Sequence, residues 1–296
     1  MDTSEQLQRQ IASFKELQTI VTTMKALAAV SIRQYEQAAR SLTDYYRTVE
    51  LGLHIVLRDV QRPVFLRRRS EGRLAAVVFG SDHGLCGRFN EEIAAYTIER
   101  LGAIPTTTKN ALVLAVGSRV ASHLEQTGLP VAGNFLVPGS ASRITATVQQ
   151  ILLKIDEWRS EENVEYVYLF YNRHLSSAAY RPTGIELLPV NLRRFKHLEE
   201  EPWPSHLLPI FTMDRQQLLS ALLKQYFFVS IFRACAESLA SEHGSRLAAM
   251  QAAEKNLEER LEEVTGEFRR VRQDSITTEL LDVVSGFEAI MGEEEY

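Results

Sequence analysis

The stretch LLKQYFFVSIFRACAESLASEHGSRLAAMQAAEKNLEERLEEVTGEFRRV, residues 222–271, decides the fold, because its apolar residues recur at alternating steps of three and four. That spacing is typical of a coiled-coil seam, which only Arg233, His243 and Glu254 interrupt. Asp214 and Gln217, just before it, have the spacing of a helix capping box. The seam residues are Leu222, Tyr226, Val229, Ala236, Ala240, Leu247, Met250, Leu257, Leu261, Val264, Phe268 and Val271.

This helix is predicted to be very long. No proline follows Pro209, so the pattern predicts a rod of about 120 Å at about 1.5 Å per residue. Beyond Val271 the seam moves by one residue, which changes the local supercoil. The apolar positions there are Ile276, Leu280, Val283, Phe287 and Ile290.

A second seam lies in the first fifty residues, where Ser31 is the only missed position. No proline occurs before Pro63, so we expect one helix from Ser4 to Leu57, about 80 Å long. The two helices can bury their seams by pairing as an antiparallel coiled coil. The longer C-terminal helix would then project beyond its partner and expose an apolar face that requires a partner outside the chain. The N-terminal seam is Phe14, Leu17, Val21, Met24, Ala28, Tyr35, Ala38, Leu42, Tyr45 and Val49.

The centre of the chain, residues 73–190, has a different period. Short apolar runs of the kind found in buried parallel strands alternate with amphipathic helical stretches. The fold class is therefore α+β overall, a long coiled coil with a central α/β, Rossmann-like domain. We expect domain bounds at 1–60, 61–211 and 212–296. The predicted strands are Leu74–Phe79, Ala111–Val116, Tyr166–Tyr171 and the edge strand Gly184–Val190, and the predicted helices are Phe89–Leu101, Val120–Thr127 and Ile144–Trp158.

Composition excludes several classes of protein. The net charge of −5 gives no support to nucleic-acid binding, which is usually accompanied by a basic excess. Cys86 and Cys235 form no CxxC pair, so neither a disulfide framework nor a cysteine-built zinc site is indicated. The N-terminus has no signal or transit-peptide pattern. Charged residues interrupt the most apolar stretch, Leu218–Ala240, so we expect a protein that is cytoplasmic or peripheral to a membrane.

The segment Gly80–Asn90 is where a nucleotide site would be sought, because it joins a strand to a helix. Its glycines do not follow GxGxxG, and no GxxxxGK[ST] occurs in the chain. Asp82, His83 and Cys86 lack the oriented base that a catalytic cysteine needs. We expect Cys86 to fill a small apolar space and Asp82 to cap the turn. Gly84 and Gly87 would supply the backbone geometry of the turn, although an anion pocket remains the alternative.

Three blocks of sequence occur together in one known family. The first runs from Ile11 to Arg33, and the second is SDHGLCG at 81–87 followed by Phe89-Asn90. The third is AESLASEH at 236–243, which continues to RQDSITTEL at 272–280. In this order they resemble the gamma subunits of F-type ATP synthases. Thr19, Thr22, Ser31 and Gln34 stand where that family often has Lys or Arg, which indicates a divergent branch of the bacterial type.

The resemblance implies a rotor shaft with no catalytic activity, no cofactor, no metal and no direct nucleotide binding. Its implied partners are the alpha and beta subunits of a catalytic hexamer, an epsilon subunit and a membrane ring of c subunits, on the cytoplasmic face of a bacterial inner membrane. By the same resemblance, Arg272, Gln273, Thr277 and Glu279 match positions that meet a moving loop of a beta subunit. Met24 and Arg33 match their neighbours on the opposing helix.

Two other hypotheses remain open from the residues alone. A coiled-coil adaptor with a ligand- or protein-binding α/β domain would explain the helices, but not the matching blocks at both ends. An enzyme with its active residues at Ser81–Asn90 lacks a base, metal or cofactor signature.

Overall fold

The computed structural model describes residues 4–57, 72–104, 111–176, 178–190 and 210–293, with side chains described as far as Gly286. It divides into two compact units. The small unit comprises 1–27 and 249–296, and the large unit comprises 28–248. The sequence-based bounds 1–60, 61–211 and 212–296 remain a prediction. Pro202, Pro204 and Pro209, which mark a linker before the C-terminal helix, lie outside the described residues.

The C-terminal helix α7 runs from Arg215 to Glu293, 79 residues, and confirms the prediction of one very long helix. Its start is capped as the Asp214 spacing predicts, because one carboxylate oxygen accepts the N–H groups of Gln216 at 2.9 Å and Gln217 at 3.1 Å. These bonds satisfy two of the backbone donors that every helix N-terminus leaves without a partner in the helix.

The N-terminal segment forms two helices, α1 (Ser4–Ser41) and α2 (Thr43–Leu57), so the prediction of one helix from Ser4 to Leu57 is wrong at Leu42. The Ser41 hydroxyl donates to the carbonyl of Ala38 at 2.9 Å, and a β-branched threonine follows Leu42. Both features weaken helical backbone bonding locally. The backbone bond from Tyr46 to Leu42, at 2.8 Å, carries the chain into α2.

A five-stranded sheet forms the centre of the large unit, in the order β3-β2-β1-β4-β5. The first four strands are parallel, and β5 is an antiparallel edge strand paired with β4. The sequence predicted all of these except β3, whose three residues are too few to show a period. The strands are β1 (Arg73–Phe79), β2 (Leu112–Val116), β3 (Gly133–Phe135), β4 (Val164–Ser176) and β5 (Ala179–Leu188).

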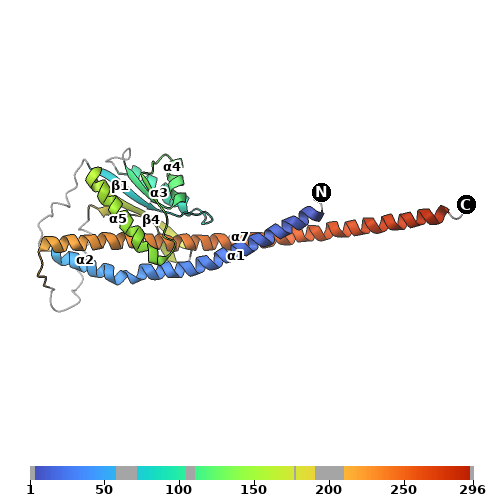
Figure 1. Cartoon of the computed structure of the whole chain (residues 1–296), viewed down its shortest axis with the longest axis horizontal. Coiled ribbons are helices and arrows are strands. Elements are labelled where there is room, and N and C mark those ends of the chain that lie inside the picture. The colour runs from blue at the N-terminus through green and yellow to red at the C-terminus, as the bar shows by residue number, and fades with distance from the viewer. Residues whose placement is uncertain (1–3, 58–71, 105–110, 177, 191–209, 294–296) are drawn as a thin grey trace. The chain divides into compact units, whose positions relative to one another are not determined.

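Helices cover both faces of the sheet (Figure 1). Alternate residues of β1 point to opposite sides, so Ala76 and Val78 pack with α3 (Phe89–Gly102) and α4 (Ser118–Gln126). Val77 and Phe79 pack in the other layer with α5 (Ile144–Glu161), which follows the short helix η3 (Ala141–Arg143), and with part of α7.

The part of α7 inside the large unit is buried almost all round. From Val229 to Arg246 the only exposed side chain is Arg233, whereas a surface helix has a broad exposed face. The sheet layer lies on one side, and α1 and α2 lie on the other. The Tyr45 hydroxyl donates to Gln225 at 2.9 Å, and a Cβ at Gly52 would lie 3.0 Å from Leu222. Residue numbers rise along α2 as they fall along α7, so these helices are antiparallel.

One window of α7 is long and apolar enough to cross a membrane by length and composition alone. The core helix of a soluble protein passes the same test. Of the residues in that window, 39% are buried within the structure.

Candidate functional surfaces

The turn after β1 is built from closely packed backbone. A Cβ at Gly80 would lie 2.3 Å from the Cβ of Val120, so only glycine lets α4 approach the strand end. The residues of this turn with left-handed backbone are Leu85, with φ of 63°, and Gly87, with φ of 59°. Gly84, the other glycine that the sequence indicated, is not among the described residues with positive φ. The conformation that favours glycine is therefore needed at Gly87.

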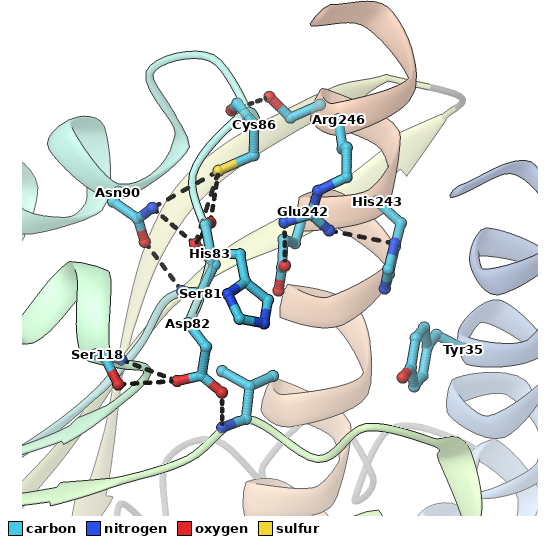
Figure 2. A network of polar contacts seen from close by, with 12 residues as sticks. Tyr35, Ser81, Asp82, His83, Cys86, Asn90, Ser118, Glu242, His243 and Arg246 are labelled. Carbon is cyan, nitrogen blue, oxygen red and sulfur yellow. Dashed lines mark hydrogen bonds and ion pairs between the residues drawn. The ribbon is translucent and has the colours of Figure 1, made fainter. Parts of the chain in front are cut away.

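Three buried side chains close the interior of this turn (Figure 2). The Asn90 side-chain carbonyl accepts the backbone N–H of Ser81 at 2.9 Å, and its amide nitrogen donates to the Ser81 hydroxyl at 2.8 Å. The same nitrogen lies 3.6 Å from the Cys86 sulfur. Burial raises the pKa of the Cys86 thiol, which keeps it from acting as a thiolate nucleophile at neutral pH. Cys86 is buried, as predicted, but its sulfur lies beside these polar groups, so the prediction that it fills an apolar space is wrong.

Asp82 connects three segments of the large unit. One carboxylate oxygen accepts the backbone N–H of Ser118 at 2.9 Å, and the other accepts that of Val137 at 2.9 Å. The prediction that Asp82 caps its own turn is therefore wrong, because it caps the first turn of α4. Gly117 makes this approach possible, since a Cβ there would lie 2.7 Å from the carbonyl oxygen of Ser81.

Helix α7 is hydrogen-bonded to the turn and to β4. The Ser245 hydroxyl donates to the carbonyl of Cys86 at 2.6 Å, and the Ser241 hydroxyl donates to the carbonyl of Asn172 at 2.9 Å. The Asn172 amide in turn donates to the carbonyl of Phe89 at 3.1 Å. The turn and β4 are therefore held to α7 by hydrogen bonds of buried side chains.

A buried ionic group lies on the same two turns of α7, at the residues next to these serines (Figure 2). Arg246 donates to the Glu242 carboxylate at 2.7 Å, and a second guanidinium nitrogen lies 3.4 Å from Nδ1 of His243. The imidazole stacks on Tyr35 of α1, with ring centroids 5.5 Å apart. His243 thus has partners within the fold, which accounts for a polar residue in the apolar stripe of α7.

Burial governs the protonation of this group. It raises the pKa of Glu242 to about 7, against the opposing charge of Arg246, and Asp82 adds to the rise. Burial also lowers the pKa of His243 to about 4, helped by the neighbouring Arg246 charge. The imidazole is therefore neutral at pH 7, so it can accept a hydrogen bond from Arg246.

The hydrogen bonds around the turn after β1 connect it to α4, β4 and α7, which is a structural role. Its polar groups are bonded mostly to one another, and no group of three or more possible metal ligands occurs among the described residues. The hypothesis of an enzyme at Ser81–Asn90 therefore has no oriented base or thiolate to support it.

The residues predicted to contact a beta subunit do not form one site within the chain. Arg272, Gln273, Thr277 and Glu279 are all exposed on α7 in the small unit. Gln273 and Thr277 share one helix face, where the threonine hydroxyl donates to the Gln273 carbonyl at 2.9 Å. Arg272 and Glu279, seven residues apart, share another. Met24 is half-buried in the small unit, and Arg33 is exposed in the large one.

The bare end of α7, residues 272–286, is not covered by any other part of the chain that the structure describes. Seam residues are partly buried as far as Val271, but every side chain from Arg272 to Gly286 is exposed. Within the small unit, Figure 1 shows α7 continuing past the beginning of α1. The sequence indicated three of the apolar residues exposed here, and Leu281 and Val284 were missed because they lie off the seam. The exposed apolar residues are Ile276, Leu280, Leu281, Val283 and Val284.

Comparison with known proteins defines the class. A family model described as ATP synthase matches residues 3–290, so the chain belongs to the ATP synthase family. Its relatives carry a more particular name, ATP synthase gamma chain. The chain is 28% identical to that of Desulfitobacterium hafniense, over 98% of this chain and 100% of the relative. It is 30% identical to that of Geotalea uraniireducens, over 99% and 100%.

Solved structures share the fold. The chain is similar to one from the Euglena gracilis mitochondrial ATP synthase in a structure of OSCP, F1 and c-ring. The TM-score is 0.70 and the identity 17%, over 99% of this chain and 96% of that one. It is also similar to a chain from a structure of the rotor of the same enzyme, with a TM-score of 0.66 and 14% identity over 92% and 98%.

Proposed function

We propose that this chain is the central rotor shaft of a rotary F-type ATP synthase, corresponding to the gamma chains it resembles. It is a non-catalytic subunit of the F1 part, peripheral to the membrane. It couples ion flow through the membrane rotor ring to conformational cycling of the catalytic beta subunits.

The bare end of α7 is the observation that carries this proposal. Fifteen residues from Arg272 to Gly286 expose every side chain, and five of them are large and apolar. A face of this kind on a soluble chain needs an external partner. The bore of a hexamer of alternating alpha and beta subunits would supply that cover from all sides.

Rotation acts through differential contact. A shaft whose sides differ meets three equivalent beta subunits in three different ways, so each angle favours a different conformation at each catalytic site. The free energy of each shift is limited by the difference in contact energy between the two states. The side chains proposed to make these contacts are Met24, Arg33, Arg272, Gln273, Thr277 and Glu279.

The large unit would connect the shaft to the membrane part of the enzyme. We propose that it binds the epsilon subunit and the membrane ring of c subunits, on the cytoplasmic face of a bacterial inner membrane. The hydrogen bonds of Ser241 and Ser245 support this proposal, because a force applied to the sheet would pass directly into α7.

Co-expression with the alpha and beta subunits tests the proposal. We expect a stable complex that contains one copy of this chain and whose ATP turnover depends on it. A chain that folds but does not join the hexamer, with turnover unchanged by its omission, would reject the role of shaft.

A further inference from the structure

An ion pair joins α1 to α7 in the seam of the small unit. The Lys25 ammonium lies 2.8 Å from one oxygen of the Glu254 carboxylate and 2.5 Å from the other. The Thr22 hydroxyl lies 3.5 Å from the first of these oxygens. Glu254 is one of the three residues that interrupt the apolar stripe of α7, and this contact explains its place there.

The position of the pair distinguishes it from an ordinary surface ion pair. The side chains of Lys25 and Glu254 are 32% and 22% exposed, whereas those of the intrahelical pair Arg260 and Glu263 are 70% and 64% exposed. Val21 on α1 and Met250 on α7 are buried, each one helical turn from a member of the pair. The charges therefore interact where water screens them less than at the surface.

Apolar side chains alone specify the alignment of two helices weakly, because a seam of similar residues packs almost as well after a slip of one turn. A polar residue at a single seam position fixes the register at some cost in stability. A slip of one turn moves one helix by about 5.4 Å along the other, which would take Glu254 out of reach of Lys25.

We propose that Lys25 and Glu254 set the register between α1 and α7 in the small unit. They are positioning residues, because they fix how far α7 extends beyond α1 and which face it turns outward. This inference goes beyond the proposed function and can be tested on the full chain without other subunits.

Cysteine cross-linking measures the register directly. Val21→Cys with Leu257→Cys reports the register in which Lys25 faces Glu254, and Val21→Cys with Leu261→Cys reports a slip of one turn. Disulfides form only when the two Cα atoms come within about 7 Å, so the two pairs discriminate between these alignments. Cys86 and Cys235 are buried and contribute little background.

Charge reversal is the perturbation. We expect Glu254→Lys to lower the ratio of the first cross-link to the second about tenfold, which corresponds to about 1.4 kcal/mol. The swapped chain, Lys25→Glu with Glu254→Lys, should recover the ratio to within about twofold, since the attraction is restored with the charges exchanged. Glu254→Gln should lower the ratio by an intermediate amount, about threefold, without placing two like charges together.

Glu258→Gln is the matched control, because it removes an exposed carboxylate one turn further along the same helix. It should leave the ratio unchanged. Circular dichroism checks that each variant keeps its helix content. A ratio that Glu254→Lys and Glu254→Gln leave unchanged, or that the swap does not recover, overturns the proposal. Failure to assemble with the hexamer would instead count against the proposed function.

Discussion

Glu242 and His243 are adjacent residues whose protonation responds to burial in opposite directions. The folded-state pKa of Glu242, about 7, is above its ordinary value of 4.5. Its contribution to stability is therefore complete below about pH 4.5 and is lost as the pH rises through about 7. The folded-state pKa of His243, about 4, is below its ordinary 6.5. Its contribution is present above about pH 6.5 and is lost as the pH falls through about 4.

The two trends oppose each other between about pH 4.5 and 6.5, so we expect a flat stability profile in the natural chain. Glu242→Gln should leave the histidine trend, and the free energy of unfolding should then rise with pH. His243→Asn should leave the glutamate trend, so that the free energy of unfolding falls as the pH rises. Each slope can reach about 1.4 kcal/mol per pH unit. Urea unfolding at several pH values, followed by circular dichroism, measures both, and equal slopes in the two variants would contradict this account.

Arg272 belongs to the bare end of α7, so its role lies outside the chain. We expect Arg272→Ala to lower coupled ATP turnover of the assembled complex about tenfold, the effect of losing about 1.4 kcal/mol from a charge-assisted hydrogen bond. The stability of the isolated chain should not change, because Arg272 is exposed. Arg270→Ala, an exposed arginine on a different helix face, is the control. Equal turnover in the two variants would remove Arg272 from the contact surface.

The sequence predicted the role of a residue correctly where its hydrogen-bond partners are close to it in the sequence. Asp214 caps its own helix, and its two acceptor bonds reach residues two and three positions on. Asp82 bonds to Ser118 and Val137, 36 and 55 residues away, so its role could not be read from its neighbours. The pairing of Lys25 with Glu254 depends in the same way on the alignment of two distant helices.

Elements were predicted well wherever a period persisted over many residues. The 79-residue helix α7 and the helices of the sheet layers have such a period. The end of α1 at Ser41 does not, because one hydroxyl bond and one β-branched neighbour decide it. The strand β3 has three residues and depends on pairing with β2.

Gly266 lies in the interior of α7, and a Cβ there would meet no heavy atom within 4 Å. Gly266→Ala should therefore stabilise the helix by about 0.5–1 kcal/mol, because alanine loses less backbone entropy than glycine. Amide hydrogen exchange around residue 266 should slow by about two- to fivefold. Gly52→Ala is the contrasting variant: its Cβ would lie 3.0 Å from the Leu222 side chain, so it should stabilise its helix less than Gly266→Ala does. Unchanged or faster exchange in Gly266→Ala would show that the glycine meets a packing demand.

At the scale of the whole molecule, the apolar residues of α7 form two groups. One group is buried and stabilises the fold, and the other is exposed and available to another subunit. Leu280 and Val283 are 61% and 70% exposed, whereas Met250 is 3% exposed on the same helix. The period alone does not separate these groups, because both continue an apolar stripe. The two groups differ in whether another part of the chain packs over them, and this is decided only when the chain folds.

Leu280→Asp with Val283→Asp should leave the melting temperature of the isolated chain unchanged and weaken its assembly with the hexamer. The lost burial of two large apolar side chains, about 1.5–3 kcal/mol each, should raise the dissociation constant at least about a hundredfold. Met250→Asp should instead lower the melting temperature of the chain itself. A loss of stability in the Leu280 and Val283 variant would mean that these residues are covered within the chain.

The burial of Val229–Arg246 has a consequence for how the protein is made. One layer of the large unit is completed by a helix from the last third of the chain, and α1, from the first fifty residues, packs against that same helix. During synthesis the sheet therefore emerges from the ribosome with this face covered by α5 but not yet by α7, and α1 has no helix to pack against until α7 is made. A nascent chain in this condition exposes apolar surface and unpaired strand edges, the features that chaperones bind.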